Sequence, residues 1–535
     1  MNTRNIDLLP QFESAFTEQK WDKLLTLLNP KSFGTLQSEE VIAFPIVAKT
    51  AEILTTKDLH VPNNIKIACL KCLGNTCFNA YTHREYKSID IQPGMCCHEL
   101  YSSLVTNNGS LKHIGSLNSY PFHSHFPYEG IIKWTTDLIK SCKIDEDTTD
   151  EQIEILRLSI QFLCNLFSFA YKDKSSLDEH NIPKFLCDPT LKDIIRNLTQ
   201  SEHTPLVRVS CIFIHNALKE FQGQSFTNQE KILLCSQLLK PIKEGFDSAK
   251  KALMNLICQA DVLKNAYNDL SVEDRLYLLE MVYSEISDAF YSSKEELQFT
   301  EDIFLFLSER FCKMSDLILK TADSYLDNME PTEIIILLDI LGSVTSASYL
   351  KDNRSLLINC TYLLKSIQEI GKASNNYFTP MQKLSDVAQM MQNSKINESE
   401  ENPTMEKLQK TENKGTEEKR DLDGHPAFGF KAGLIRIIGN MAHRNEKLQD
   451  LLREMDVIPL LLDCCNIDAR NPLIMQWTIF AVRNLCEANP GNQEIVRNCS
   501  RIGVVENNVL QEMGMTLHED ETGRQVGVVP LVRHE

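Results

Sequence analysis

Cysteine residues provide the side chains best suited to metal chemistry in this sequence. Cys69 and Cys72 form a C-x2-C pair, and Cys96 and Cys97 follow further along the chain. Thiolates in such a cluster can bind Zn or Cu. A metal-handling protein that uses these four ligands is therefore our alternative function. Cys69 and Cys72 also fall on the expected apolar face of a helix, and a buried free cysteine behaves as a small hydrophobic residue. We favour core thiols at these two positions.

A second pair, Cys211 and His215, stands four residues apart, so one helical turn would bring the thiol beside the imidazole. This spacing suits two metal ligands or a nucleophile with its base. No third group that would orient the pair is evident, and we favour helix packing. The sequence contains no GxSxG, P-loop or HExxH motif, and no GxGxxG after a strand. We predict that the protein is not an enzyme and needs no cofactor.

Regularly spaced asparagines indicate the elements that position these side chains. When GLIRIIGNMAHRNEKLQDLL (433–452) is aligned with WTIFAVRNLCEANPGNQEIV (477–496), Asn440 matches Asn484 and the offset is 44 throughout. Similar segments upstream are centred on Asn75, Asn165 and Asn216. A period near 40–47 is typical of armadillo and HEAT repeats, in which each unit consists of two or three helices.

Each repeat segment has an apolar face when it is read as a helix. Positions six, three and two residues before the asparagine and one residue after it share one face. These positions hold Cys69, Cys72, Leu73 and Thr76; Ser159, Phe162, Leu163 and Leu166; Ser210, Phe213, Ile214 and Ala217; Leu434, Ile437, Ile438 and Met441; and Thr478, Ala481, Val482 and Leu485. No segment shows the alternation of a strand. The sequence therefore predicts an all-α protein, an armadillo- or HEAT-like α-solenoid (an α-α superhelix).

Equivalent polar positions of a solenoid form a ladder along one surface. In armadillo proteins generally, an asparagine of the third helix lines the concave groove, where its amide can pair with a peptide backbone. The candidate protein-binding residues in the two clearest repeats are Arg436, Asn440, His443, Phe480 and Asn484. We favour the simpler alternative for the asparagines, in which they tether neighbouring helices.

Composition narrows the classes of partner. The chain has 535 residues, 42% of them hydrophobic, and a net charge of −18 with no long basic block. An acidic surface repels phosphate backbones and anionic lipids, so nucleic acid is excluded as a partner. No apolar run is long enough to insert into a membrane. We expect no secretory signal, and we expect the 17 cysteines to be reduced thiols in the cytosol or nucleus.

Two polar stretches divide the predicted array. Residues 1–392 form an N-terminal armadillo-like array with an inserted loop at about 82–130. Residues 393–423 form an acidic linker that is too polar to bury a core and is predicted to be disordered. Two further repeats occupy 424–517, and a tail follows at 518–535.

The C-terminal repeats resemble the ataxin-10 domain. The resemblance runs from Asp423 to about Met513 and depends on FGFKAGLIRIIGNMAHRN, LQDLL, DVIPLLLDCCNIDARNP and the W-x5-RNL-x3-N-x2-NQ pattern that begins at Trp477. The upstream helices and the acidic linker also match the layout of this family. The long insertion and the extended tail depart from it.

The resemblance implies a non-enzymatic, armadillo-like scaffold or adaptor that is cytoplasmic and often perinuclear. It implies roles in cytokinesis, neurite outgrowth (neuron projection development) and cell survival. The implied partners are O-GlcNAc transferase and a heterotrimeric G-protein β subunit. The exposed ends of a solenoid would also allow a homo-oligomer.

Overall fold

The computed structural model describes residues 8–34, 42, 44–82, 128–170, 183–291, 299–322, 330–373, 376–380, 425–465, 468, 470–499, 515–519 and 526–530. The chain divides into two compact units. The first contains Met1–Arg275 and Gln298–Ile303, and the second contains Leu276–Leu297 and Phe304–Glu535. Residues 83–127 of the predicted insertion and the whole predicted linker lie outside the described residues.

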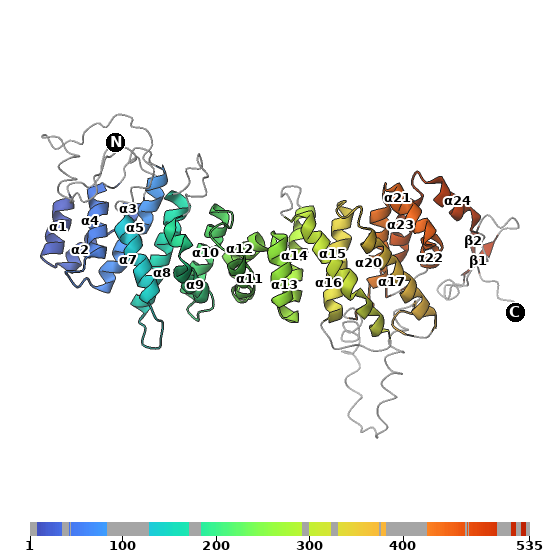
Figure 1. Ribbon diagram of the computed structural model, residues 1–535, viewed down its shortest axis with the longest axis horizontal. Coiled ribbons are helices and arrows are strands. Elements are labelled where there is room, and N and C mark those ends of the chain that lie inside the picture. The colour runs from blue at the N-terminus through green and yellow to red at the C-terminus, as the bar shows by residue number, and fades with distance from the viewer. Residues whose placement is uncertain are drawn as a thin grey trace, which may run out of the picture. The chain divides into compact units, whose positions relative to one another are not determined.

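The first unit is a stack of helices (Figure 1). Its α-helices are α1 (Leu9–Thr17), α2 (Trp21–Leu27), α3 (Pro30–Phe33), α4 (Phe44–Thr55), α5 (Asn63–Thr82), α7 (Tyr128–Ser141), α8 (Asp150–Asn165), α9 (Pro189–Leu198), α10 (Thr204–Glu220), α11 (Asn228–Lys243), α12 (Asp247–Ile257) and α13 (Ala260–Asp269). Two short elements interrupt it, the π-helix η3 (Leu166–Ala170) and the 3-10 helix η5 (Lys184–Cys187).

The second unit is also helical. Helix α14 (Val272–Tyr291) crosses the boundary between the units, and the first residues of α15 belong to the first unit. The remaining elements are α15 (Glu301–Met314), the 3-10 helix η6 (Ser315–Thr321), α16 (Glu330–Ser346), α17 (Arg354–Ala373), α20 (Phe430–Ala442), α21 (Glu446–Glu454), α22 (Val457–Asp463), α23 (Ile474–Cys486) and α24 (Pro490–Asn498). The predicted all-α, armadillo- or HEAT-like solenoid class is confirmed.

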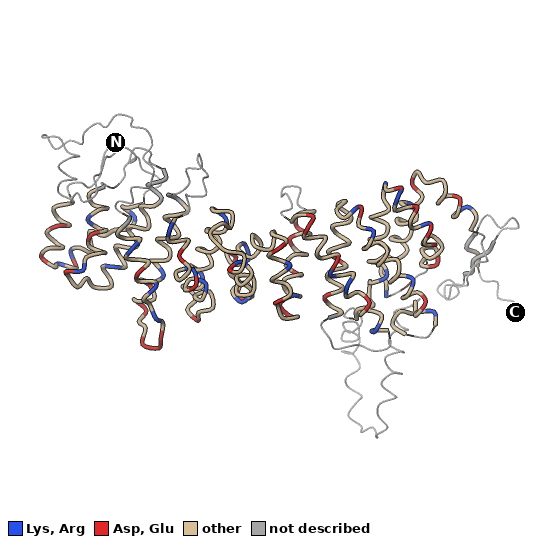
Figure 2. The backbone as a smooth tube through the Cα atoms, in the orientation of Figure 1, with Lys and Arg blue, Asp and Glu red and all other residues tan. Residues whose placement is uncertain are grey.

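Local sequence signals begin these helices. Thr149 and Gln152 form a capping box at the start of α8, and Thr227 and Glu230 form one at α11, so otherwise unpaired backbone N–H groups are bonded. Acidic and basic residues are interspersed along the helices of both units (Figure 2).

The 44-residue period is present in the helices themselves. Helices α20 and α23 begin 44 residues apart and also end 44 residues apart, and the same holds for α21 and α24. Asn445 caps α21 by accepting from the N–H of Leu448, and Asn489 caps α24 by accepting from the N–H of Asn492. The repeat therefore extends through the helix caps.

The predicted core positions are buried. Every position at the four predicted offsets around Asn75, Asn165, Asn216, Asn440 and Asn484 is classed as buried except Val482, which is half-buried. Four of these positions carry a serine or threonine rather than an apolar residue. Thr478 and Ser159, for example, donate their hydroxyls to carbonyls one turn earlier in their own helices, so these small polar groups do not need water.

A short β-hairpin corrects the prediction that no segment forms a strand. Strand β1 (Met515–Glu519) pairs antiparallel with β2 (Val526–Pro530), and Leu517 stands opposite Val528. The first strand begins within the predicted repeats and the second lies in the predicted tail. The five-residue segments are too short for a periodic pattern to separate strand from coil, and pairing between the two segments stabilises them.

Helix α23 has an outward face unlike that of α20. In α20, Ala432, Ile435 and Gly439 are all buried. Their equivalents in α23 are Gln476, Ile479 and Arg483; all three are exposed, and Ile479 is 60% exposed. Helix α23 covers α20, whereas no described helix covers the outward face of α23.

The C-terminal helices pack on helices that precede the predicted linker. A Cβ at Gly433 of α20 would lie 2.6 Å from Cδ2 of Leu338 in α16, so the two helices are in close contact. Nζ of Lys431 donates to Gln368 of α17 at 3.1 Å, and the Arg470 guanidinium donates to the carbonyl of Asn376 at 2.7 Å. The compact unit that contains the C-terminal repeats thus includes α16 and α17, although our predicted domain bounds placed them in the N-terminal array.

Candidate protein-binding surface

The repeat asparagines tether adjacent helices. Nδ2 of Asn484 donates to the carbonyl oxygen of Gly439 at 2.9 Å. Nδ2 of Asn440 donates to the carbonyl oxygen of Gly342 at 3.1 Å and to Oγ1 of Thr345 at 3.1 Å. In both cases the acceptor carbonyl belongs to the residue just before the equivalent position in the preceding repeat, which is Asn440 for one and Ser343 for the other.

The same arrangement occurs in the first unit. Asn165 donates to the carbonyl of Gly74, the residue before Asn75, at 3.3 Å. Asn216 donates to Sγ of Cys164, the residue before Asn165, at 3.2 Å. The hydrogen bonds of these asparagines therefore support the alternative in which they tether neighbouring helices. Both side-chain N–H groups of Asn440 already donate to acceptors within the protein.

Glycine before the asparagine lets the next helix approach closely. A Cβ at Gly439 would lie 3.0 Å from Cα of Ala481 and 3.3 Å from Cδ1 of Phe480. A Cβ at Gly342 would lie 3.2 Å from one terminal nitrogen of Arg436. Arg436 and Phe480, each four residues before a repeat asparagine, therefore lie across the glycine of the preceding helix.

Arg436, Trp477 and Phe480 form a partly exposed cluster on α20 and α23. The Arg436 guanidinium lies 5.4 Å from the centroid of the Trp477 ring, a cation–π contact. Trp477 and Phe480 meet edge to face with ring centroids 6.0 Å apart. All three side chains are half-buried. Trp477 thus connects Arg436 of α20 with Phe480 of α23.

The Arg436 guanidinium has no hydrogen-bonding partner within the described part of the chain, and its Nε is buried. Asp339 of α16 is the nearby acidic group. Burial raises the pKa of the Asp339 carboxyl, and the charge of Arg436 only partly offsets that effect. The two side chains form no ion pair among the described residues, so the terminal nitrogens of Arg436 have no hydrogen-bond acceptor there.

His443, the fifth predicted site residue, lies at the end of α20. Its Nδ1 is 3.3 Å from Oε2 of Glu487, and Arg444 contacts the same carboxylate at 3.8 Å. The His443 side chain is 46% exposed. It thus belongs to a surface charge cluster with Arg444 and Glu487 at the C-terminal ends of α20 and α23. A protein-binding role for all five residues stays a prediction.

The cysteines of the metal alternative are in different situations. Cys69 and Cys72 lie fully buried on α5, and burial strongly raises the pKa of both thiols, which disfavours the thiolate that a metal needs. Cys96 and Cys97 lie outside the described residues. Among the residues that are described, no group of three or more His, Cys, Asp or Glu side chains could hold a metal.

Cys211 and His215 share α10 as predicted. Cys211 is buried, and burial raises its pKa to about 12. Burial also lowers the pKa of His215, and the charges of Lys219 and Lys251 lower it further. A protonated thiol beside a neutral imidazole is not an activated nucleophile, because the imidazole is too weak a base to hold the proton of such a thiol.

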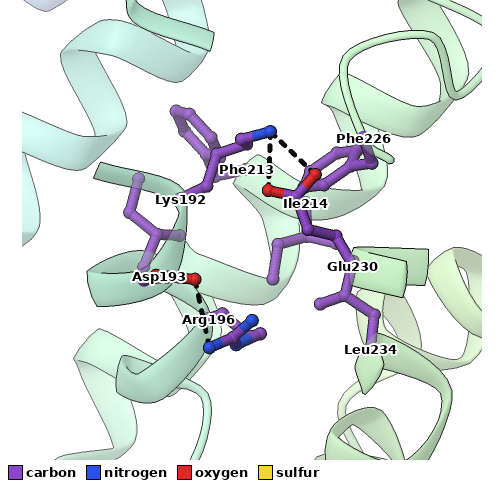
Figure 3. A pocket seen from close by; sticks show the side chains of 9 residues that line it. Lys192, Asp193, Arg196, Phe213, Ile214, Phe226, Glu230 and Leu234 are labelled. Carbon is purple, nitrogen blue, oxygen red and sulfur yellow. Dashed lines mark hydrogen bonds and ion pairs between the residues drawn. The ribbon is translucent and has the colours of Figure 1, made fainter. Parts of the chain in front are cut away.

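The pocket drawn in Figure 3 lies among α9, α10 and α11. Nζ of Lys192 donates to Glu230 and to the carbonyl of Ser225 and lies 5.4 Å from the centre of the Phe226 ring. Asp193 pairs with Arg196 at 3.1 Å. The pocket volume of about 10 Å³ leaves room for roughly one water molecule. These polar groups therefore serve packing rather than ligand binding.

Sequence reasoning missed three contributors to this surface. Trp477 was used only as a family motif, although its spacing of three residues from Phe480 places it on the same helix face. Gly342 and Gly439 precede positions of the repeat, and a small residue at a recurring position indicates close helix approach. The contact between Arg436 and Trp477 joins residues 41 positions apart, and no local pattern predicts it.

No described helix is both long enough and apolar enough to cross a membrane. Residues 430–527 match the family model described as "Spinocerebellar ataxia type 10 protein domain". This match covers α20 to α24, β1 and the first two residues of β2.

Full-length relatives support the same assignment. Ataxin-10 of Xenopus tropicalis is 35% identical over 272 residues, which are 49% of this chain and 48% of that protein. Ataxin-10 of Bos taurus is 27% identical over 402 residues, 73% of this chain and 74% of that protein. The Dictyostelium discoideum Ataxin-10 homolog is 41% identical over 95 residues, 18% of this chain and 16% of that protein. The chain thus spans about half the length of the frog protein.

Solved structures similar to this chain include Kap121p, with 12% identity, a TM-score of 0.31 and coverage of 92% of this chain and 45% of that one. Importin beta in an ammonium sulfate condition has 11% identity, a TM-score of 0.26 and coverage of 93% and 60%. Neither likeness is close enough to support a functional argument. The C-terminal domain match and the Ataxin-10 relatives confirm the resemblance of this chain to the ataxin-10 family.

Proposed function

We propose that this protein is a non-enzymatic scaffold or adaptor that binds other proteins through the surface of its helical repeats. The repeat scaffold is the common property of the fold and the family. The observation that supports the proposal is the row of half-buried side chains that α20 and α23 present beside their tethering asparagines. Arg436, Trp477 and Phe480 combine a cation with two aromatic rings, and Arg, Trp and Tyr are the residue types most enriched at protein-binding hot spots.

The biological setting follows from the resemblance to the family. We place the protein in the cytoplasm, often near the nucleus, with roles in cytokinesis, neurite outgrowth and cell survival. O-GlcNAc transferase and a G-protein β subunit are the proposed partners. Self-association is a further part of the proposal, and light scattering from the full chain over a range of concentrations tests it.

Charge reversal at Arg436 tests the binding surface. We expect Arg436→Glu to weaken capture of purified O-GlcNAc transferase or G-protein β subunit by about tenfold or more, because truncation of a central hot-spot residue typically costs about 2 kcal/mol. Immobilised full-length protein is incubated with each purified partner, and the bound fraction is measured over a concentration series.

Arg497→Glu is the matched control, since Arg497 is an exposed arginine on α24, a helix that carries none of the three cluster residues. Circular dichroism and thermal unfolding establish that both variants are folded. Equal capture by Arg436→Glu and wild type, for both partners, would rule out this surface as their binding site.

A further inference from the structure

Two contacts hold Arg436 in place. Its guanidinium lies over the Trp477 ring, 5.4 Å from the ring centroid, and it also lies against Gly342, where a Cβ would come within 3.2 Å. An arginine side chain normally loses several rotatable bonds when it binds a ligand. Here the packing has already removed that freedom, so the side chain is pre-organised.

The donors of this guanidinium are unused inside the described structure. Nε is buried without a partner, and Asp339 forms no ion pair with it among the described residues. The other interior cations of the second unit differ in this respect. Lys431 donates to Gln368, and Arg470 donates to the carbonyls of Asn376 and Thr379. A half-buried cation that keeps its hydrogen-bonding capacity is suited to a ligand from outside.

The ladder asparagines cannot supply that recognition. Asn440 donates its side-chain N–H groups to Gly342 and Thr345. Asn484 is only 2% exposed and donates to Gly439. A partner segment that lies along α20 and α23 therefore meets Arg436, rather than the asparagine amides, as its polar anchor. The planar fork of a guanidinium matches the two oxygens of a carboxylate or phosphate.

We propose that Arg436, stacked on Trp477, is a specificity-determining residue that selects partner segments carrying an anionic side chain, either a carboxylate or a phosphate. This inference rests on the proposed function and adds the chemistry of the partner to it. Phe480, edge-on to Trp477, gives the residues that flank the anion an apolar surface to pack against.

The test uses the full-length chain and immobilised peptide pools that are random except for one central residue. That residue is glutamate, phosphoserine, serine or lysine, so carboxylate and phosphate are read separately. We expect wild type to prefer a glutamate or phosphoserine pool over the serine pool by about tenfold, since a charge-assisted pair contributes about 1.5–3 kcal/mol, and raised salt should weaken the preference.

Two substitutions separate charge from geometry. Arg436→Gln should abolish the preference, while Arg436→Lys should retain only part of it, because lysine keeps the charge but loses the planar fork. Arg497→Gln, at the matched exposed arginine of α24, should behave as wild type. Thermal unfolding of each variant establishes that the loss is not a loss of fold.

The outcomes separate this inference from the proposed function. Equal binding to all four pools, or a preference that survives Arg436→Gln, overturns the anion-selecting role while the scaffold proposal stands. Absence of binding to every pool also overturns this role. If Arg436→Glu also leaves capture of the purified partners unchanged, the result contradicts the proposed binding surface as well as the anion-selecting role.

Discussion

Glycines 342 and 439 show how one missing side chain sets the geometry of a repeat. Each lies just before the tether position, and each accepts a hydrogen bond on its carbonyl from an asparagine of the next helix. The absent Cβ is what allows that helix to come near enough for the bond. The packing of the array and the positions of Arg436 and Phe480 thus depend on the same two residues.

Gly439→Ala should destabilise the protein. The new methyl group would lie 3.0 Å from backbone Cα of Ala481, which cannot move without shifting α23. We expect a loss of about 1–3 kcal/mol in the free energy of unfolding, as for other overpacked cores. Denaturant unfolding measures it.

Gly130→Ala serves as the comparison, because a Cβ at Gly130 in α7 meets no atom within 4 Å. Alanine should stabilise α7 there by up to about 1 kcal/mol through its higher helix propensity. Two variants of equal stability would contradict the close-approach argument.

His425 makes the free energy of unfolding depend on pH. Burial, with a smaller contribution from the charge of Arg470, lowers the pKa of His425 to about 4 from its ordinary value near 6.5. Above pH 6.5 the imidazole is neutral in both folded and unfolded chains. Below pH 6.5 the imidazole of the unfolded chain binds a proton more readily than that of the folded chain. The free energy of unfolding therefore decreases as the pH falls from about 6.5 to about 4, by about 3 kcal/mol in all.

His425→Phe should remove this part of the pH dependence, since phenylalanine can keep the stack on Tyr377, whose ring lies 3.8 Å away and nearly parallel. The measurement is the free energy of unfolding of wild type minus that of the variant from pH 4 to 7. A difference that does not change with pH would refute the assignment, and other titrating groups cancel in the subtraction.

At the scale of elements, the second unit is held together by contacts between residues that precede position 381 and residues that follow position 424. Gln368 and Lys372 of α17 both bond to Asp463 of α22, and Arg470 donates to the carbonyls of Asn376 and Thr379. Tyr377 and His425, on either side of that segment, stack on each other. The two ends of the segment are therefore fixed next to one another by the folded helices.

A chain cut within residues 393–423 should stay assembled. After a protease site is inserted there and cleaved, we expect both pieces to co-elute on size exclusion at micromolar concentration, because the buried contacts of α16 and α17 with α20 do not need the connecting segment. Arg470→Ala combined with Asp463→Ala, in the same cut chain, is expected to loosen the complex. Separation of the pieces without these substitutions would show that the C-terminal repeats are an independent domain.

At the scale of the whole molecule, the sequence predicted what depends on helical periodicity and not what depends on contacts between helices. The offsets around Asn75, Asn165, Asn216, Asn440 and Asn484 located the core because a helix repeats every 3.6 residues. The bond from Asn440 to Gly342 joins residues 98 positions apart, across the predicted linker, and no periodicity reaches that far. The same limit hid the Arg436–Trp477 contact and the pairing of β1 with β2.

The outward face of α23 differs from that of α20 in its ability to accept another helix. Where α20 has Ala432 and Gly439, which admit another helix, α23 has Gln476 and Arg483, whose long polar side chains would have to be displaced before a further helix could seat. A further helix on this face would cover Ile479, which is 60% exposed, and it would need smaller side chains in place of Gln476 and Arg483. Two long polar side chains thus oppose the docking that the exposed isoleucine would favour.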